Sequence, residues 1–160
     1  MRPRMMMTAA MAAMLAAPIP ARAKDCKRVS GPFSAVRPAS CPSPVRICTH
    51  GRLTGGLTAT YDFVADAQTD GPPTVKLTGH STITIDKSGA TLKGEDTSSV
   101  EIATGAFTTT VQIVSGTQKY EKAGGTIVAE GIVDLEKGTT AGTYSGTICK
   151  KGKSEAGRVD

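Results

Sequence analysis

The stretch GTQKYEKAGGTIVAEGIVDLEKGTTAGTYSGTIC, residues 116–149, decides the fold. It begins with a glycine-marked turn, continues as a strand over 124–135, and turns tightly at Lys137-Gly138 before a last strand that ends at Cys149. Two β-rich runs separated by a short glycine-containing turn are typical of an antiparallel hairpin. The C-terminal part of the chain is therefore predicted to end an all-β domain.

The same strand-like pattern runs through the upstream sequence. Thr, Val and Ile recur, glycines interrupt at short intervals, and no window places apolar residues at helical spacing. Seven or eight strands joined by short turns are typical of an antiparallel barrel or a sandwich. The short connections favour up-and-down order, and the fold we predict is a single antiparallel barrel of eight strands. We expect strands over 29–37, 54–65, 74–86, 90–102, 107–115, 124–135 and 140–149.

Residues 1–23 are organised like a secretory signal peptide. Arg2 and Arg4 precede an apolar run over 5–17 that is too short to span a bilayer, and Ala21-Arg22-Ala23 matches an A-x-A cleavage site. A membrane anchor is the alternative interpretation. Residues 24–149 would then form the barrel and 150–160 a disordered polar tail. The signal peptide predicts that the protein is secreted or periplasmic and that it does not contact the membrane after cleavage.

The charge pattern argues against a nucleic-acid partner. The chain has 19 basic and 14 acidic residues, but three of its arginines lie within residues 1–23, which leaves 16 against 14. A nucleic-acid surface needs clustered basic side chains with stacking aromatics, and only three Phe and three Tyr are present. Because no phosphate-binding or dinucleotide motif occurs, no cofactor is expected.

Four cysteines form an even set in a chain predicted to be exported, which favours two disulfides. Zinc is the alternative, but Cys41 and Cys48 are too far apart for a zinc knuckle and no His pair lies nearby, so no metal is expected. The first and last strands of a closed barrel pair, which predicts Cys26–Cys149 and leaves Cys41–Cys48. Pairing of Cys48 with Cys149 is the other connectivity considered, because Cys48 also precedes a long strand.

The segment from Phe107 to Cys149 resembles the closing part of the allene-oxide-cyclase-like and dirigent-like β-barrels. Residues 111–121, VQIVSGTQKYE, are similar to the strand and glycine-rich turn of these families, and 134–138, DLEKG, to the turn before their last strand. Residues 41–51 look like the opening of small secreted bacterial relatives. The resemblance implies an eight-stranded barrel with an apolar cavity, often a dimer or trimer, whose plant members act on or orient hydrophobic small molecules.

Asp96 is the main candidate for chemistry. It shares strand parity with Leu92 and Val100, so a regular strand directs it inward. Burial there raises the pKa of the carboxyl, which could then act as a general acid or base or hold a ligand hydroxyl. The alternative is a bulge near Gly94 that shifts the register and exposes Asp96.

Tyr61 and Tyr144 are the other candidate ligand-binding residues. Tyr61 lies on an apolar parity, and Tyr144 alternates with glycines that leave room for a large side chain. Core packing is the alternative role for both. His80 lies on the polar parity of its strand and His50 is expected in a loop, so both are expected in solvent.

Three functions are compatible with these patterns. An exported barrel could bind a small hydrophobic ligand, act as a cyclase or isomerase through Asp96, or be a structural protein with a filled interior. Both an enzyme and a binding protein without activity are compatible with the sequence, and so is a homo-oligomer.

The signal-peptide interpretation makes a direct prediction. When the full chain is expressed in an exporting host, we expect the exported protein to begin at Lys24, because cleavage follows Ala23. N-terminal sequencing and intact mass measure this. A product that retains residues 1–23 and stays in the membrane fraction would support the anchor instead.

Overall fold

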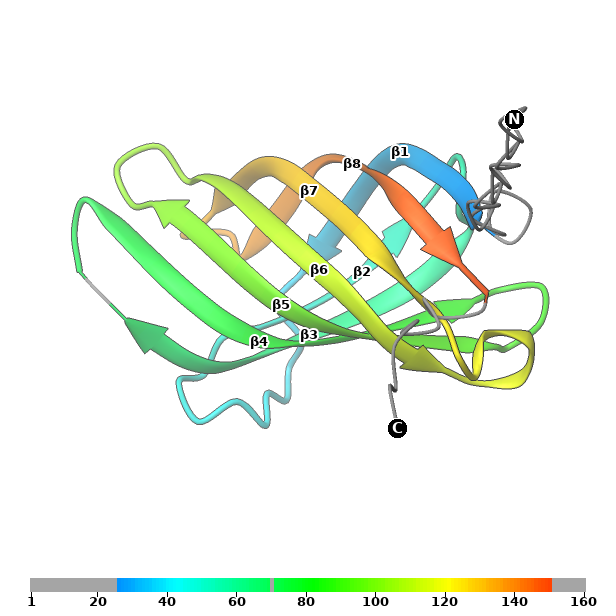
Figure 1. The fold of residues 1–160 in the computed structure, drawn as a ribbon. Coiled ribbons are helices and arrows are strands. Elements are labelled where there is room, and N and C mark those ends of the chain that lie inside the picture. Colours follow the sequence, from blue (N-terminus) through cyan, green and yellow to red (C-terminus); the bar gives the residue numbers. More distant parts are fainter. Residues whose placement is uncertain (1–25, 70, 151–160) are drawn as a thin grey trace, which may run out of the picture.

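The computed structural model describes residues 26–69 and 71–150; the predicted signal peptide and the tail from residue 151 lie outside the described residues. Eight antiparallel strands form a closed barrel in up-and-down order (Figure 1), which confirms the predicted fold class. A short 3-10 turn, η1 (Gln118–Tyr120), connects the sixth and seventh strands. The strands are β1 (Cys26–Val36), β2 (Cys48–Leu53), β3 (Ala59–Thr69), β4 (Thr74–Ile85), β5 (Thr91–Glu101), β6 (Ala106–Gly116), β7 (Gly124–Asp134) and β8 (Thr139–Cys149).

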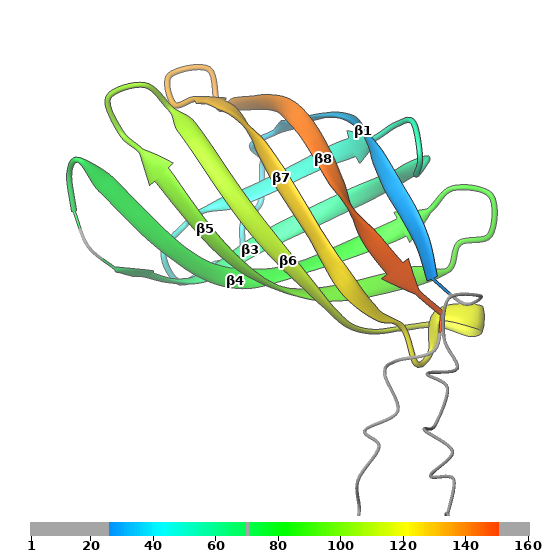
Figure 2. The same cartoon turned by 45° about the horizontal axis from the view of Figure 1, so that its top comes forward.

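The barrel closes where β1 meets β8. These strands pair along their whole lengths, from Cys26 opposite Cys149 to Val36 opposite Thr139 (Figure 2). The Cys26–Cys149 disulfide joins the first and last residues of the sheet at one end of the barrel, here called the seam end. A second disulfide, Cys41–Cys48, closes the loop between β1 and β2. Both predicted pairings are confirmed.

The structure corrects the second predicted strand. Residues 54–58 connect β2 to β3, and β2 itself occupies Cys48–Leu53, so His50 lies in a strand rather than a loop. The sequence around Gly51 lacks alternation, and the segment is a strand because it packs between β1 and β3. Gly51 allows this close packing, since a Cβ there would lie 2.6 Å from Cε1 of Tyr61.

A bulge does lie beside Gly94, but its extra residue belongs to β6. Lys93 pairs with Ser115 and Gly94 pairs with Ile113, which leaves Val114 of β6 without a partner on β5. Burial along β5 therefore alternates without interruption from Leu92 onward. Of the two alternatives considered for Asp96, the inward orientation is the one observed, and the exposed orientation is wrong.

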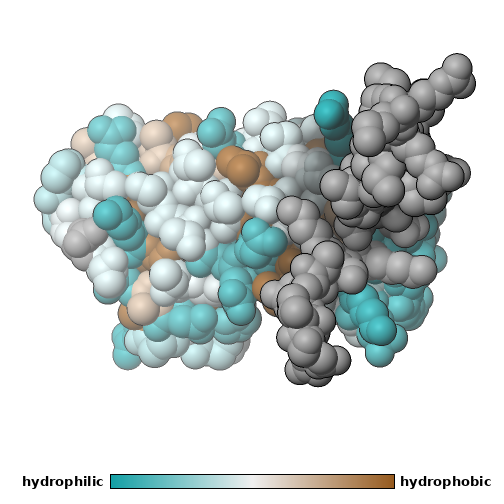
Figure 3. Space-filling model, in the orientation of Figure 1, coloured by the Kyte–Doolittle hydropathy of each residue, from teal (hydrophilic) through white to brown (hydrophobic). Residues whose placement is uncertain are grey.

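The seam end of the barrel is filled with apolar side chains. The loop at 54–58 closes this end, held by the hydroxyl of Tyr144, which accepts a hydrogen bond from the Leu57 amide and donates one to the Thr54 carbonyl, both at 2.8 Å. On the outer face drawn in Figure 3, hydrophobic side chains form scattered patches among hydrophilic ones. Within the described ranges, no helix is long and apolar enough to cross a membrane. The core at the seam end includes Val29, Leu57, Ala59, Leu92, Ile113, Ala123 and Ile148.

The two disulfides should contribute unequally to stability. Their cysteines are separated by 123 and 7 residues, and the chain-entropy model assigns about 5 kcal/mol to the longer loop and about 2.5 kcal/mol to the shorter. We expect the Cys26→Ser/Cys149→Ser variant to lose more thermal stability than the Cys41→Ser/Cys48→Ser variant. Melting followed by circular dichroism measures the difference, and equal losses would contradict the seam as the dominant constraint.

Candidate functional site

The half of the barrel opposite the seam end is hollow. It contains a cavity of about 290 Å³ whose wall is mainly apolar. The wall includes Phe33, Ile83 and Val111, which belong to the core, and Ile102 and Leu135, which are 37% and 48% exposed. The turns after β1, β3, β5 and β7 surround this end of the barrel, which is called the mouth below. An apolar interior of this size can hold one small molecule.

Asp96 lines this cavity near the middle of β5 and is only 4% exposed. Ser81, on the neighbouring strand β4, donates a hydrogen bond to Oδ2 of Asp96. Oδ1 is buried and has no hydrogen-bond partner among the described residues. Buried carboxylate oxygens are normally paired, so this atom is the unsatisfied acceptor of the cavity.

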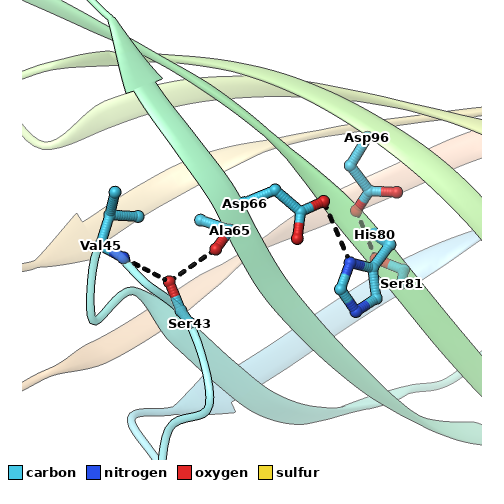
Figure 4. A network of polar contacts seen from close by, with 7 residues as sticks. All are labelled: Ser43, Val45, Ala65, Asp66, His80, Ser81 and Asp96. Atoms are coloured by element: carbon cyan, nitrogen blue, oxygen red, sulfur yellow. Dashed lines mark hydrogen bonds and ion pairs between the residues drawn. The ribbon is translucent and has the colours of Figure 1, made fainter.

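Burial raises the pKa of Asp96 to about 6, because the apolar surroundings disfavour the charged form. The hydrogen bond from Ser81 and the positive charge of His80 oppose this shift, and Asp66 adds to it. Figure 4 shows how these groups are divided: Ser81 and Asp96 face each other, while His80 contacts Asp66, with 3.1 Å between Nδ1 and Oδ2. The carboxyl therefore titrates near neutral pH, as general acids and bases do.

The hydroxyl groups of Ser98 and Thr109 lie near Asp96 and Ser81, and the four residues form a row of polar side chains across the cavity wall. Ser98 is buried two residues further along β5, and its Oγ lies 2.7 Å from Oγ1 of Thr109 on β6. These polar residues lie on β4, β5 and β6 within a mainly apolar wall. Sequence reasoning missed Ser81 and Ser98, although each is a polar residue on the inward parity of its strand.

Tyr61 lies in the cavity wall, as its parity predicted. It is half-buried, and its burial raises the pKa of the hydroxyl to about 12, with a hydrogen bond to Thr49 opposing the shift. Its ring meets Phe33 edge-on, with 6.1 Å between ring centroids, and Phe33 meets Phe107 in the same way. Tyr61 therefore stays protonated and offers the cavity an aromatic face.

Tyr144 has a role that sequence parity did not reveal. It is 2% exposed and its ring lines the cavity, but its hydroxyl is bonded to the backbone of the 54–58 loop. Burial also raises the pKa of this hydroxyl. Tyr144 can therefore contact a ligand through its ring, while its hydroxyl closes the seam end.

Both histidines lie outside the cavity. His50 is exposed on β2, where its Nδ1 lies 2.7 Å from Oδ1 of Asp62, and His80 is exposed on β4. The described residues contain no group of three or more His, Cys, Asp or Glu side chains arranged to hold a metal ion. All cysteines among the described residues are paired in disulfides.

The fold and the cavity define the class of protein: a disulfide-closed antiparallel β-barrel with a partly hollow interior. Two disulfides are typical of proteins in an oxidising compartment. Comparison of the chain with protein-family models, curated proteins and solved structures finds no significant match. The resemblance of residues 107–149 to the allene-oxide-cyclase-like barrels therefore stays a hypothesis.

The position of Asp96 predicts a pH dependence of stability. The pKa of the folded group, about 6, lies above its ordinary value of 3.8, so the protonated form is favoured in the folded state. Stability from this group is greatest at low pH and falls by about 3 kcal/mol as pH rises from about 4 to above 6. We expect Asp96→Asn to abolish this fall.

Urea unfolding between pH 4 and pH 7.5 measures this difference. Glu95→Gln is the matched control, because Glu95 is the exposed neighbour on β5 and its substitution should leave the pH dependence unchanged. An Asp96→Asn variant with the pH dependence of the parent protein would show that the carboxyl does not titrate in an apolar interior.

Proposed function

We propose that this barrel binds a small, mainly hydrophobic molecule in its cavity, in the periplasm or outside the cell. The single observation that carries the proposal is a hollow apolar interior containing one buried carboxylate with an unpaired oxygen. The cavity favours ligand binding over a purely structural, filled barrel. The disulfides and the predicted signal peptide are consistent with export.

Asp96 restricts the chemistry of the ligand. A buried carboxylate without partners for both oxygens is costly, and a ligand that donates a hydrogen bond to Oδ1 would remove part of this cost. The ligand we propose therefore has an apolar body that carries a hydroxyl or another donor. Aromatic rings of Phe33, Tyr61 and Phe107 would contact that body.

A cyclase or isomerase acting on a reactive hydrophobic substrate is the second candidate function. The observation that favours it is the raised pKa of Asp96, which lies in the range used for general acid–base catalysis. Both candidate functions require that a hydrophobic molecule binds inside the cavity. They differ in whether Asp96 moves a proton or only accepts a hydrogen bond.

Two naphthalene probes test the proposed function. 2-Naphthol has a hydroxyl donor where 2-methylnaphthalene has a methyl group of similar size, and no tryptophan emission overlaps with their fluorescence because the chain has no tryptophan. We expect 2-naphthol to bind about tenfold more tightly at pH 7.5, through a hydrogen bond to the ionised carboxylate. Asp96→Asn should reduce this preference.

A second test fills the cavity with a larger side chain and compares the result with the same substitution on the outer face. Ala129 lines the cavity on β7, so Ala129→Leu should abolish binding of both probes. Ala141 is exposed on the outer face of β8, and Ala141→Leu should leave binding unchanged. Probe binding that survives Ala129→Leu would place the probes outside the barrel and contradict the proposal.

A further inference from the structure

We propose that the ligand is an elongated hydrophobic anion, with its hydrogen-bond donor at Asp96 and its anionic group held at the mouth by Arg37 and Arg46. This inference rests on the proposed function, because it names the class of molecule that the same cavity would take. It follows from the position of charges along the cavity and from the way the mouth is built.

The charges that line the cavity are separated by depth. Two are basic, Arg37 and Arg46, and both belong to the segment that follows β1 at the mouth. The one acidic residue, Asp96, lies five positions inside the mouth end of β5 at Glu101. At the strand rise and tilt of an eight-stranded barrel, this corresponds to a depth of roughly 12 Å. Among the charged residues that line the cavity, the two basic ones therefore lie at the mouth and the acidic one lies inside.

Arg46 is held at the mouth in an unusual backbone conformation. Its φ of 60° is in the left-handed region, which costs free energy for a residue other than glycine and persists only where the surroundings fix it. The Arg46 amide donates a hydrogen bond to the Ser43 carbonyl at 3.0 Å. The Cys41–Cys48 disulfide joins the two sides of this loop. The backbone hydrogen bond and the disulfide therefore hold the backbone of Arg46 in place at the mouth.

Ser43 anchors the loop to the barrel wall. Its buried hydroxyl donates a hydrogen bond to the Ala65 carbonyl at 2.6 Å and accepts bonds from the amides of Val45 and Ile47, each at 3.2 Å. Figure 4 shows Ser43 between Val45 and Ala65. The Ala65 amide in turn donates to the Ile47 carbonyl at 3.0 Å. The loop around Arg46 is therefore tied to β3 on both sides of Arg46.

Arg37 is positioned by the turn between β7 and β8. Its amide donates to the Gly138 carbonyl at 2.8 Å, and its side chain lies along that glycine: a Cβ on Gly138 would be 3.6 Å from Nε. Within residues 26–69 and 71–150, no carboxylate forms an ion pair with either Arg37 or Arg46. Both guanidinium groups are thus available to an anion, which arginine binds through several donors.

Electrostatics favour one orientation of such a ligand. An anionic group placed deep in the cavity would face the Asp96 carboxylate in an apolar medium, where like charges repel strongly. At the mouth the same group meets two cations and remains in contact with water. The exposed apolar side chains of Ile102 and Leu135 also line the cavity and would cover the ligand body below its charged group.

The test uses 6-hydroxy-2-naphthoate and its methyl ester, which share a hydroxyl and an aromatic body but differ in charge at the opposite end. At pH 7.5 we expect Arg37→Gln and Arg46→Gln each to weaken binding of the acid about fivefold and to leave the ester unchanged. Arg28→Gln removes the same charge from the exposed face of β1 near the seam end and should affect neither probe. Binding of the acid, but not the ester, should also weaken as salt is added.

The outcomes separate this inference from the proposed function. If acid and ester bind equally and neither Arg37→Gln nor Arg46→Gln discriminates between them, the cavity binds neutral molecules and the anionic class is wrong. If 2-naphthol, the acid and the ester all fail to bind, the proposed function itself is overturned, and this inference with it.

Discussion

Pairing of β1 with β8 is the constraint on which the rest of the structure depends. An open sheet of eight strands would leave two edges with unpaired amides and carbonyls, and closure satisfies both at once. Closure also gives the sheet an inside and an outside, so strand parity decides where each side chain points except where a bulge in β3 or β6 shifts it. The Cys26–Cys149 disulfide limits the freedom of the unfolded chain at the position where this closure has to occur.

The cavity follows from the size of the inward side chains. Near the seam end these are apolar, with Leu57, Leu92 and Ile113 among them, and they fill the barrel. In the middle they become small or polar, as at Gly79, Ser81, Ser98 and Ala129, and the interior of an eight-stranded barrel is then wide enough to stay hollow. Asp96 lies in this hollow part with one oxygen unpaired, which is a cost to folding. Residues that break the local rules of stability in this way are expected at functional sites.

Much of this could be predicted from the sequence, because parity and turn residues depend on local spacing. The up-and-down order of the strands follows from it, and the disulfide pairing follows from closure of the predicted barrel. The inward position of Asp96 was only one of two alternatives, because parity does not show that the extra residue of the bulge lies on β6 and not on β5. β2 was missed because Cys48–Leu53 contains little alternation and becomes a strand only between its neighbours. The position of Arg46 was also beyond sequence reasoning, since it depends on a left-handed backbone conformation and on contacts of Ser43 with β3.

The two ends of the barrel differ: the seam end is closed and filled, and the opposite end is the mouth of the cavity. The two ends of a bound ligand would therefore meet different surroundings. At the seam end, the hydroxyl of Tyr144 binds the backbone of the 54–58 loop, and apolar side chains fill the space beneath it. At the opposite end, the Cys41–Cys48 loop is braced at the side of the mouth. A ligand of the kind proposed would therefore enter through the mouth with its apolar part first, and its last group would stop beside Arg37 and Arg46. The direction of access and the order of charges along the cavity thus favour the same orientation.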